Sequence, residues 1–267
     1  MLHSNKLLTA TLLTLIAGTS SLAEAAPLAT FSNPANGWQQ LADEDNASPG
    51  DGIGVAVGPG LGGQAFDAEY LFYRMTGSLL SIGLQTGFDL GDGKVSSGGK
   101  DYYAGDLALS FDSTPATYEY AVDFGLKTKD YSGNKVGDPA DGIDPEGFYL
   151  VSAWNNNIAF TASTPFAMQS GTLQAGALVD NSWLYNLDLQ SHARIVTIDL
   201  SQVTALAGII HTGFTLGAHW TMSCGNDVIE GSVPVAPVPE PATLLLFGIG
   251  LTGIAGFRRT RLRRRPA

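Results

Sequence analysis

The chain has 267 residues, of which 44% are hydrophobic and 15% charged, and its formal net charge is −11. The segment from Ala26 to Pro237 is more acidic still, because it holds seven basic residues against 23 acidic ones, a charge of about −16. This acidity disfavours binding to nucleic acid or to anionic lipid headgroups, since both require cationic contacts. A single cysteine, Cys224, excludes an internal disulfide.

The first 25 residues are typical of a secretory signal peptide. Lys6 precedes an apolar run over residues 7–16, and the sequence AEA at 23–25 has the small residues that precede a cleavage site. The apolar run is too short to span a hydrocarbon core of about 30 Å. We therefore expect a signal helix that signal peptidase removes after Ala25 or Ala26, and we expect the domain that follows to lie outside the cytoplasm.

Residues 26–232 are predicted to form one all-β domain. Clusters of glycine, aspartate and asparagine separate short runs that are rich in β-branched and aromatic residues. In residues 118–124, every second side chain is Tyr, Val or Phe, which is the period of a half-buried strand. Many short strands with turns between them favour an antiparallel β-sandwich or a jelly roll. The expected strands are Gly54–Val57, Glu69–Met75, Leu79–Thr86, Asp106–Phe111, Tyr118–Leu126, Gly147–Trp154, Gly176–Leu178, Arg194–Leu200 and Gly213–Thr221.

The end of this domain is expected to hold one short helix and then a linker. Ser201 offers an N-cap for a helix over Ser201–Ile209, in which Val203 and Leu206 lie on one side. Residues 233–239 are rich in proline, which fixes φ and lacks an N–H group. We therefore expect residues 233–239 to be an extended spacer outside the sheets.

A 16-residue apolar run at 242–257 and a basic cluster follow this linker. As an α-helix the run would reach about 24 Å, which flanking residues extend toward the thickness of a bilayer. Basic clusters stay on the cytoplasmic side of a membrane. The sequence thus predicts a single transmembrane helix at 242–257 with the domain outside and a basic tail, 258–265, inside. The basic residues are Arg258, Arg259, Arg261, Arg263, Arg264 and Arg265.

The order of these parts resembles the PEP-CTERM sorting domain of Gram-negative bacteria, here over residues 238–265. Pro239-Glu240-Pro241, an apolar helix and an arginine cluster follow one another at the end of the chain. The resemblance implies that exosortase, a membrane-embedded cysteine protease, recognises Pro239, Glu240 and Pro241 and processes the tail. It also implies transient anchoring in the inner membrane, and then a place at the cell surface or outside the cell, in exopolysaccharide or biofilm. An ordinary C-terminal anchor is the alternative, because its helix and arginines would be the same.

A second resemblance covers the end of the β domain. The sequence HWTMSCGND at 219–227 is similar to a segment that precedes the sorting signal in other exosortase-dependent surface proteins. Residues 103–107 and 149–154 resemble parts of the same group. The function of that group is generally unassigned, so the resemblance bears on the placement of the protein and not on its chemistry.

His219, Cys224 and Asp227 suggest a nucleophile with a base, but their pattern favours a structural role. Alternation places Cys224 on the same face as Trp220 and Met222, where a cysteine behaves as a small buried apolar residue. Residues 225–227, GND, are typical of a turn. The sequence also lacks a zinc-hydrolase histidine pair, a P-loop and a nucleophile elbow. We therefore expect no catalytic residues and a protein that is not an enzyme.

Calcium is the one ligand that the acidic residues suggest, and no other cofactor is expected. Residues 138–147 hold four carboxylates among prolines and glycines, and calcium prefers oxygen ligands of this kind. The candidate ligands are Asp138, Asp141, Asp144 and Glu146. A second cluster holds Asp43, Glu44, Asp45, Asn46 and Asp51. Neither follows the EF-hand pattern, and the alternative for both is a solvated acidic turn.

Three functions remain open from the sequence. The leading one is an exported, non-enzymatic surface protein associated with exopolysaccharide or biofilm. The second is a carbohydrate-binding module, assisted by calcium, and the third is a surface enzyme that acts on polysaccharide. Tryptophans that could stack on sugars, although a β-sandwich more often buries them, are Trp38, Trp154, Trp183 and Trp220.

Overall fold

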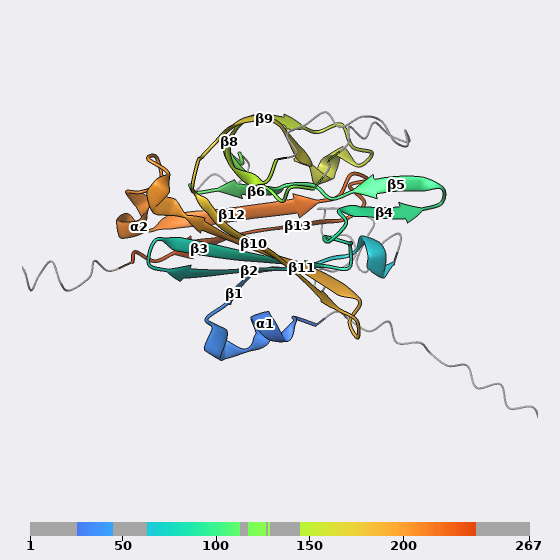
Figure 1. Cartoon of the computed structure of the whole chain (residues 1–267), viewed down its shortest axis with the longest axis horizontal. Coiled ribbons are helices and arrows are strands. Elements are labelled where there is room, and N and C mark those ends of the chain that lie inside the picture. The colour runs from blue at the N-terminus through green and yellow to red at the C-terminus, as the bar shows by residue number, and fades with distance from the viewer. Residues whose placement is uncertain (1–25, 45–62, 113–116, 127, 129–144, 239–267) are drawn as a thin grey trace, which may run out of the picture.

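The computed structural model describes residues 26–44, 63–112, 117–126, 128 and 145–238. These residues form two packed antiparallel sheets and a small separate hairpin (Figure 1). The prediction of an all-β, sandwich-like fold is confirmed. The expected strand Gly54–Val57, the signal helix and the transmembrane helix lie outside the described residues.

The five-stranded sheet is the lower layer in Figure 1, and all its neighbouring strands run antiparallel. Three strands expected from the sequence form its centre, and the two edge strands are additions. In spatial order the strands are β1 (Gln39–Asp43), β2 (Ala68–Thr76), β3 (Leu79–Thr86), β11 (Ser191–Asp199) and β10 (Leu178–Asn186).

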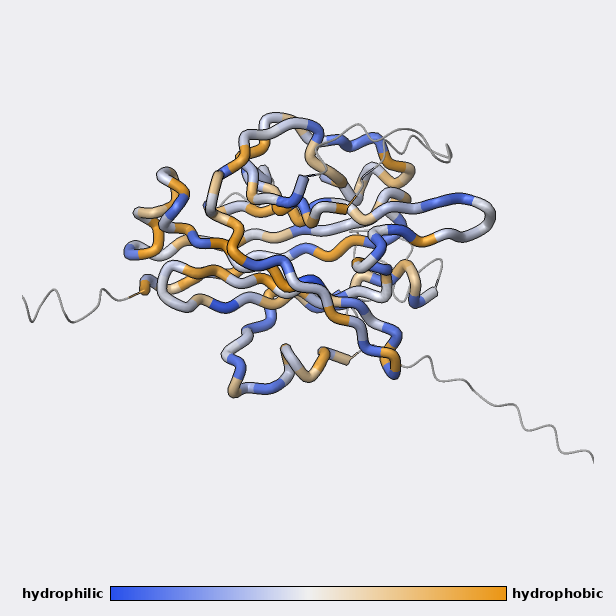
Figure 2. Tube along the Cα trace, viewed as in Figure 1, coloured by the Kyte–Doolittle hydropathy of each residue, from blue (hydrophilic) through white to orange (hydrophobic). Residues whose placement is uncertain are grey.

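The six-stranded sheet is the upper layer. In spatial order its strands are β13 (Val228–Val235), β12 (Phe214–Thr221), β6 (Leu107–Ser110), β7 (Tyr120–Asp123), β8 (Gly147–Asn155) and β9 (Ala167–Leu173). A separate hairpin, which is mostly hydrophilic in Figure 2, consists of β4 (Lys94–Ser97) and β5 (Lys100–Tyr103). The helical elements are single turns: α1 (Ala29–Ser32), η1 (Pro34–Asn36), η2 (Gln64–Phe66), η3 (Thr161–Ser163), η4 (Leu200–Gln202) and α2 (Ile209–Thr212).

The main hydrophobic core lies between the two sheets. Trp220 of β12 is fully buried there, and its ring meets Phe88 edge to face with the centroids 6.1 Å apart. Tyr120 of β7 stacks on Phe148 of β8 at 5.1 Å. Each such aromatic side chain buries a large apolar area and so contributes strongly to the core. The core therefore stabilises the domain without a disulfide.

The two sides of the sandwich, where the edge strands of the two sheets lie, differ in how closely those strands pack. On one side the edge strands β1 and β13 meet, and a Cβ atom added to Gly231 would lie 2.8 Å from the carbonyl oxygen of Leu41. On the opposite side lie the edge strands β9 and β10, which are joined through residues 174–177. We call these the closed side and the open side of the sandwich.

A segment before β1 covers the outer face of the five-stranded sheet, where α1 lies in Figure 1. Phe31 of this segment stacks on Phe72 at 4.6 Å, and Leu28 is buried in the same cluster. The side chain of Gln85 accepts a hydrogen bond from the backbone N–H of Leu28 and donates one to the carbonyl oxygen of Ala26. The chain is thus fixed to the sheet from Ala26 onward.

The prediction of a half-buried strand at 118–124 is corrected in two respects. Strand β7 begins at Tyr120, and its outward-facing Ala121 and Asp123 are fully buried. Ala121 packs in a second apolar cluster that includes Met168. Tyr118 lies before the strand, on the outer side, where its ring is 5.3 Å from that of His219. Side chains of the neighbouring strands, among them Tyr149 of β8 and Met168 of β9, cover the outer face here, so alternation with polar residues does not report exposure.

The expected helix Ser201–Ile209 is wrong. The chain forms a 3-10 turn at Leu200–Gln202, then hydrogen-bonded turns, and α-helix only at Ile209–Thr212. The residue that caps the first turn is Asp199 and not Ser201, because the Asp199 carboxylate accepts a hydrogen bond from the N–H of Ser201. Val203 and Leu206 are nevertheless buried in the core, so the apolar positions were identified correctly and their backbone was not.

The predicted spacer 233–239 is also corrected. Strand β13 extends through Val233, Pro234 and Val235, and Pro234 pairs with Thr215 of β12. A proline is tolerated here because β13 is an edge strand, whose outward N–H groups take no part in the ladder. Beyond the strand, the N–H of Val238 donates to the carbonyl oxygen of Ile210. The folded part of the chain thus continues to Val238.

Candidate functional site

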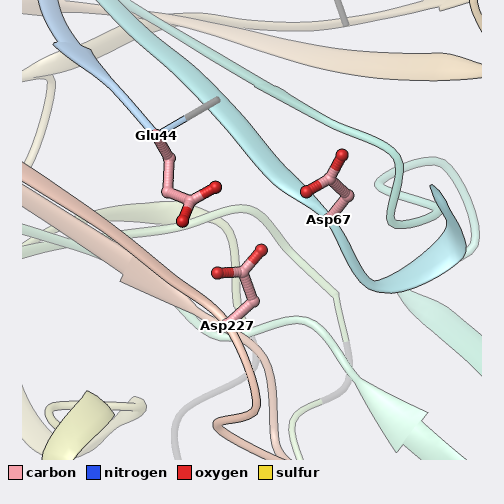
Figure 3. A group of neighbouring side chains, drawn as sticks. All are labelled: Glu44, Asp67 and Asp227. Atoms are coloured by element: carbon pink, nitrogen blue, oxygen red, sulfur yellow. The ribbon is translucent and has the colours of Figure 1, made fainter. Parts of the chain in front are cut away.

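Three carboxylates from distant parts of the sequence meet at one end of the closed side. Glu44 follows β1, Asp67 precedes β2 and Asp227 precedes β13 (Figure 3). Each offers one oxygen atom, and these three atoms lie within 4.8 Å of one another. We call these residues the acidic cluster.

Strand pairing creates this arrangement. The N–H of Glu44 donates to the carbonyl oxygen of Glu69 at 3.0 Å, which continues the β1–β2 ladder and places Glu44 beside the start of β2. Asp227 lies in the turn between β12 and β13, and its Oδ2 accepts a 2.6 Å hydrogen bond from the N–H of Ala68. The two sheets are therefore connected directly at the cluster.

Burial dominates the electrostatics of the acidic cluster. Asp227 is only 1% exposed, and burial, together with the charges of Glu44 and Asp67, raises its pKa to about 9. Backbone N–H groups of Ala68 and Val228 donate to its carboxyl group and oppose the rise. Asp227 therefore keeps a proton at neutral pH when only protein groups surround it.

The cluster can act in two ways. It can share a proton, as closely spaced carboxyl groups do, or the three oxygens can contribute to a site for a hard cation. Calcium and magnesium prefer carboxylate oxygens, and calcium takes about 6–8 of them, so three carboxylates would supply part of a coordination shell. The donor set fits such an ion and not a soft metal, which would need thiolate or imidazole.

The calcium loop predicted from the sequence is only partly described. Asp138, Asp141 and Asp144 lie outside the described residues, and Glu146 is exposed just before β8. The prediction for this loop stays a prediction.

The second predicted acidic group contributes a single member to the cluster, Glu44. Asp45, Asn46 and Asp51 lie outside the described residues, while the Asp43 carboxylate accepts a hydrogen bond from Gln40. Sequence inspection missed Asp67, because only strand pairing brings it near the other two carboxylates.

His219, Cys224 and Asp227 do not form a catalytic triad. Cys224 is buried in the core, where its thiol contacts the Asn226 side chain, and burial raises its pKa to about 11. A thiol with this pKa is not a nucleophile at neutral pH. The prediction that Cys224 is a buried core residue is confirmed.

His219 belongs to a different network on the outer face of the six-stranded sheet. Its Nε2 lies 2.9 Å from the carbonyl oxygen of Pro165, and its Nδ1 lies 3.2 Å from Oε2 of Glu230. The hydrogen bond with His219 lowers the pKa of Glu230, whereas burial and the charge of Glu230 raise that of Tyr118. This network fastens the loop around Pro165 to the sheet.

The four tryptophans divide between core and surface. Trp220 is in the core, Trp154 donates from Nε1 to the carbonyl oxygen of Tyr118, and Trp38 lies under the Arg74 guanidinium at 4.6 Å. Trp183 differs, because it is 45% exposed on the edge strand β10. The expectation that a β-sandwich buries its tryptophans thus fails for Trp183.

Comparison with known proteins identifies the C-terminal end of the chain. Residues 237–259 match the family of the PEP-CTERM protein-sorting motif, and this range contains Pro239, Glu240 and Pro241. No curated protein and no solved structure matches the chain. The chain therefore carries a PEP-CTERM sorting motif, which supports its assignment as an exosortase-targeted, secreted surface protein. Within the described residues, none of the helices has the length and apolarity that a membrane crossing needs.

Proposed function

We propose that the protein is a non-enzymatic component of an exopolysaccharide or biofilm matrix, which exosortase sorts to the outside of a Gram-negative cell. The observation that carries this proposal is the sorting motif at 237–259, directly after the last strand of a folded β-sandwich. The apolar run at 242–257 would hold the protein in the inner membrane until the tail is processed, with the arginines from Arg258 onward on the cytoplasmic side.

The positions of the reactive side chains support a role without catalysis. Cys224 is buried with a raised pKa, and His219 is held between Pro165 and Glu230. A catalytic group must reach a substrate, and neither side chain is free to do so. His219 has a structural role instead, because it connects the loop at Pro165 to Glu230 of β13.

The N-terminal segment favours one of the two expected cleavage positions. Gln85 donates from Nε2 to the carbonyl oxygen of Ala26, and the same nitrogen lies 2.7 Å from Oε2 of the buried Glu69. Signal peptidase cleavage after Ala25 keeps Ala26 and this bond, whereas cleavage after Ala26 removes them. We propose that the mature chain begins at Ala26, which the intact mass of the mature protein will report.

The mass of the exported protein tests the sorting proposal. Wild-type protein and a variant with Pro239, Glu240 and Pro241 changed to alanine are compared in the membrane and medium fractions. We expect the wild type to have lost its tail and the variant to keep it in the membrane. Pro234→Ala is the matched control, because it removes a nearby proline that precedes the matched range 237–259 and should leave processing intact.

Two results would contradict the proposal. A wild type that keeps its full tail would make the segment an ordinary membrane anchor. A variant processed as fully as the wild type would mean that Pro239-Glu240-Pro241 is not recognised.

A further inference from the structure

An aromatic surface lies on the edge strand β10, at the open side of the sandwich. Trp183 and Tyr185 are two positions apart, so both point to the same face of the strand. Each is 45% exposed. His192 of β11 lies directly opposite Tyr185, and its ring is 4.5 Å from Tyr185 and 6.1 Å from Trp183. We call Trp183, Tyr185 and His192 the aromatic platform.

The platform is held in place before any ligand arrives. A Cβ atom added to Gly91 would lie 2.7 Å from the Trp183 ring, so the indole rests directly on the glycine backbone. Burial lowers the pKa of His192, with Asp89 and Asp92 opposing this effect, so the imidazole between the rings is neutral at neutral pH. Fixed rings lose little conformational entropy on binding, which favours affinity.

Polar groups border the platform. Oδ1 of Asp89 lies 3.4 Å from Nδ1 of His192. The same oxygen accepts hydrogen bonds from the backbone N–H groups of Gly91 and Asp92. Arg194 of β11 pairs with Trp183 of β10 in the ladder, and its Nε–H donates a hydrogen bond to the carbonyl oxygen of Leu90. Aromatic faces with a few placed polar groups beside them are the usual composition of a small-molecule site.

We propose that the aromatic platform binds an uncharged polysaccharide, with sugar rings stacked on Trp183 and Tyr185 and hydroxyl groups bonded to Asp89. The C–H bonds on a sugar face carry partial positive charge and meet the negative face of an aromatic ring. The proposal rests on the proposed function, since it names the ligand that would keep the protein in a matrix.

Charge selects this occupant. The chain carries about −16 between Ala26 and Pro237, and Asp89 and Asp92 place part of this charge beside the rings, whereas Arg194 is buried and bonded to Leu90. An anionic polysaccharide would be repelled, and so would a second copy of the chain. A peptide that added a strand to β10 would bind through backbone hydrogen bonds to the sheet edge and would not need the aromatic rings.

Affinity electrophoresis of the mature exported protein tests the proposal. Gels containing hydroxyethylcellulose or dextran serve as uncharged probes, and a gel containing alginate as the anionic one. We expect retardation in at least one uncharged gel and none in alginate. Trp183→Ala should weaken that interaction about tenfold or more, which corresponds to about 1.4 kcal/mol, and Tyr185→Ala should weaken it in the same gel. Trp183→Phe should keep most of the affinity, because it keeps an aromatic face.

Leu184→Ala is the matched control, since Leu184 lies on the same strand but points to the other face. It should leave retardation unchanged. The site is overturned if neither uncharged gel retards the wild type, if alginate retards it instead, or if Trp183→Ala binds like wild type. A concentration-dependent dimer that Trp183→Ala and Leu184→Ala disrupt equally would replace the proposal with self-association. The sorting experiment is independent of all these outcomes, so the two proposals can fail separately.

Discussion

The two edges of the five-stranded sheet end in opposite ways. Strand β1 meets β13 of the other sheet so closely that Gly231 has no room for a side chain. Strand β10, at the other edge, exposes apolar side chains on both faces, among them Val179 and Leu184. An exposed apolar edge is a liability that soluble proteins usually avoid. The difference indicates that the closed side serves stability, and that the open side is kept free for an interaction.

Gly231 allows the largest test of this comparison. A Cβ atom there would clash with the Leu41 backbone, so Gly231→Ala should force the sheets apart and lower the free energy of unfolding by about 1–3 kcal/mol. Gly208 has open space around it, and Gly208→Ala should not destabilise the domain. Denaturant unfolding measures both variants, and equal stabilities would show that the closed side is not tightly packed.

Two valines, one on the closed side and one on the open side, allow a matched comparison with a slightly smaller expected effect on stability. Val235 of β13 is 6% exposed, whereas Val179 of β10 is 54% exposed. Val235→Ala removes two buried methyl groups and should cost about 2 kcal/mol. Val179→Ala removes the same atoms from a solvated position and should change stability by less than about 0.5 kcal/mol. Equal losses in the unfolding experiment would mean that the open side is covered in solution.

The acidic cluster predicts an unusual pH dependence at the closed side. The pKa of Asp227 is about 9 in the folded chain, well above its unfolded value of about 3.9, so the folded state binds the proton more tightly. The stability that the folded protein gains from holding this proton is therefore complete below pH 4 and is lost as the pH rises toward 9. Stability measured in chelator should fall across this range.

Glu44→Gln sharpens this test, because it removes the charge that contributes most to the shift after burial. At pH 10, where Asp227 of the wild type is ionised, the variant should be more stable than wild type by about 1 kcal/mol, the equivalent of about one pKa unit. Asp43→Asn, which changes a neighbouring charge outside the cluster, is the control. A wild type whose stability rises between pH 5 and 8 in chelator would contradict the buried, protonated Asp227.

A small effect on stability is expected at the aromatic platform. Trp183→Ala should lower the free energy of unfolding by about 1 kcal/mol or less, since the ring is 45% exposed and loses only its contacts with Gly91 and His192. Thermal unfolding of this variant beside Val235→Ala will show the contrast. A loss as large as that of Val235→Ala would assign Trp183 to the core of the domain and remove the case for a binding surface.

The sequence predicted the centre of each sheet better than the edges. Strands such as Leu79–Thr86 have Leu or Ile at every second position, as at Leu80, Ile82 and Leu84, and this period identifies them. The edge strands β9 and β10 hold serine, asparagine and aspartate, because an edge has solvent on one side and does not need an apolar run. The end of β13 was predicted as a spacer because it contains Pro234, although an edge strand tolerates a proline.

The candidate sites could be predicted only where their residues are adjacent in sequence. The sorting motif is a continuous segment, and its resemblance is recognisable because Pro239-Glu240-Pro241, the apolar run and the arginine cluster follow one another. The acidic cluster depends on the pairing of β1 with β2 and on the turn before β13, which no local pattern reports. The sequence offers Trp183 as one of four tryptophans that could stack on sugars, but its exposure follows from the place of β10 at an edge.

Hydrogen exchange of the mature protein tests the difference between the two sides most directly. Both β10 and β13 are edge strands, so comparable fractions of their amides lack a partner within the sheet. We predict slow exchange over Val228–Val235 and faster exchange over Leu178–Asn186, and an uncharged polysaccharide that binds should slow exchange near Trp183 and Gly91 only. Equal exchange in the two strands, or protection by polysaccharide at the closed side, would contradict the account.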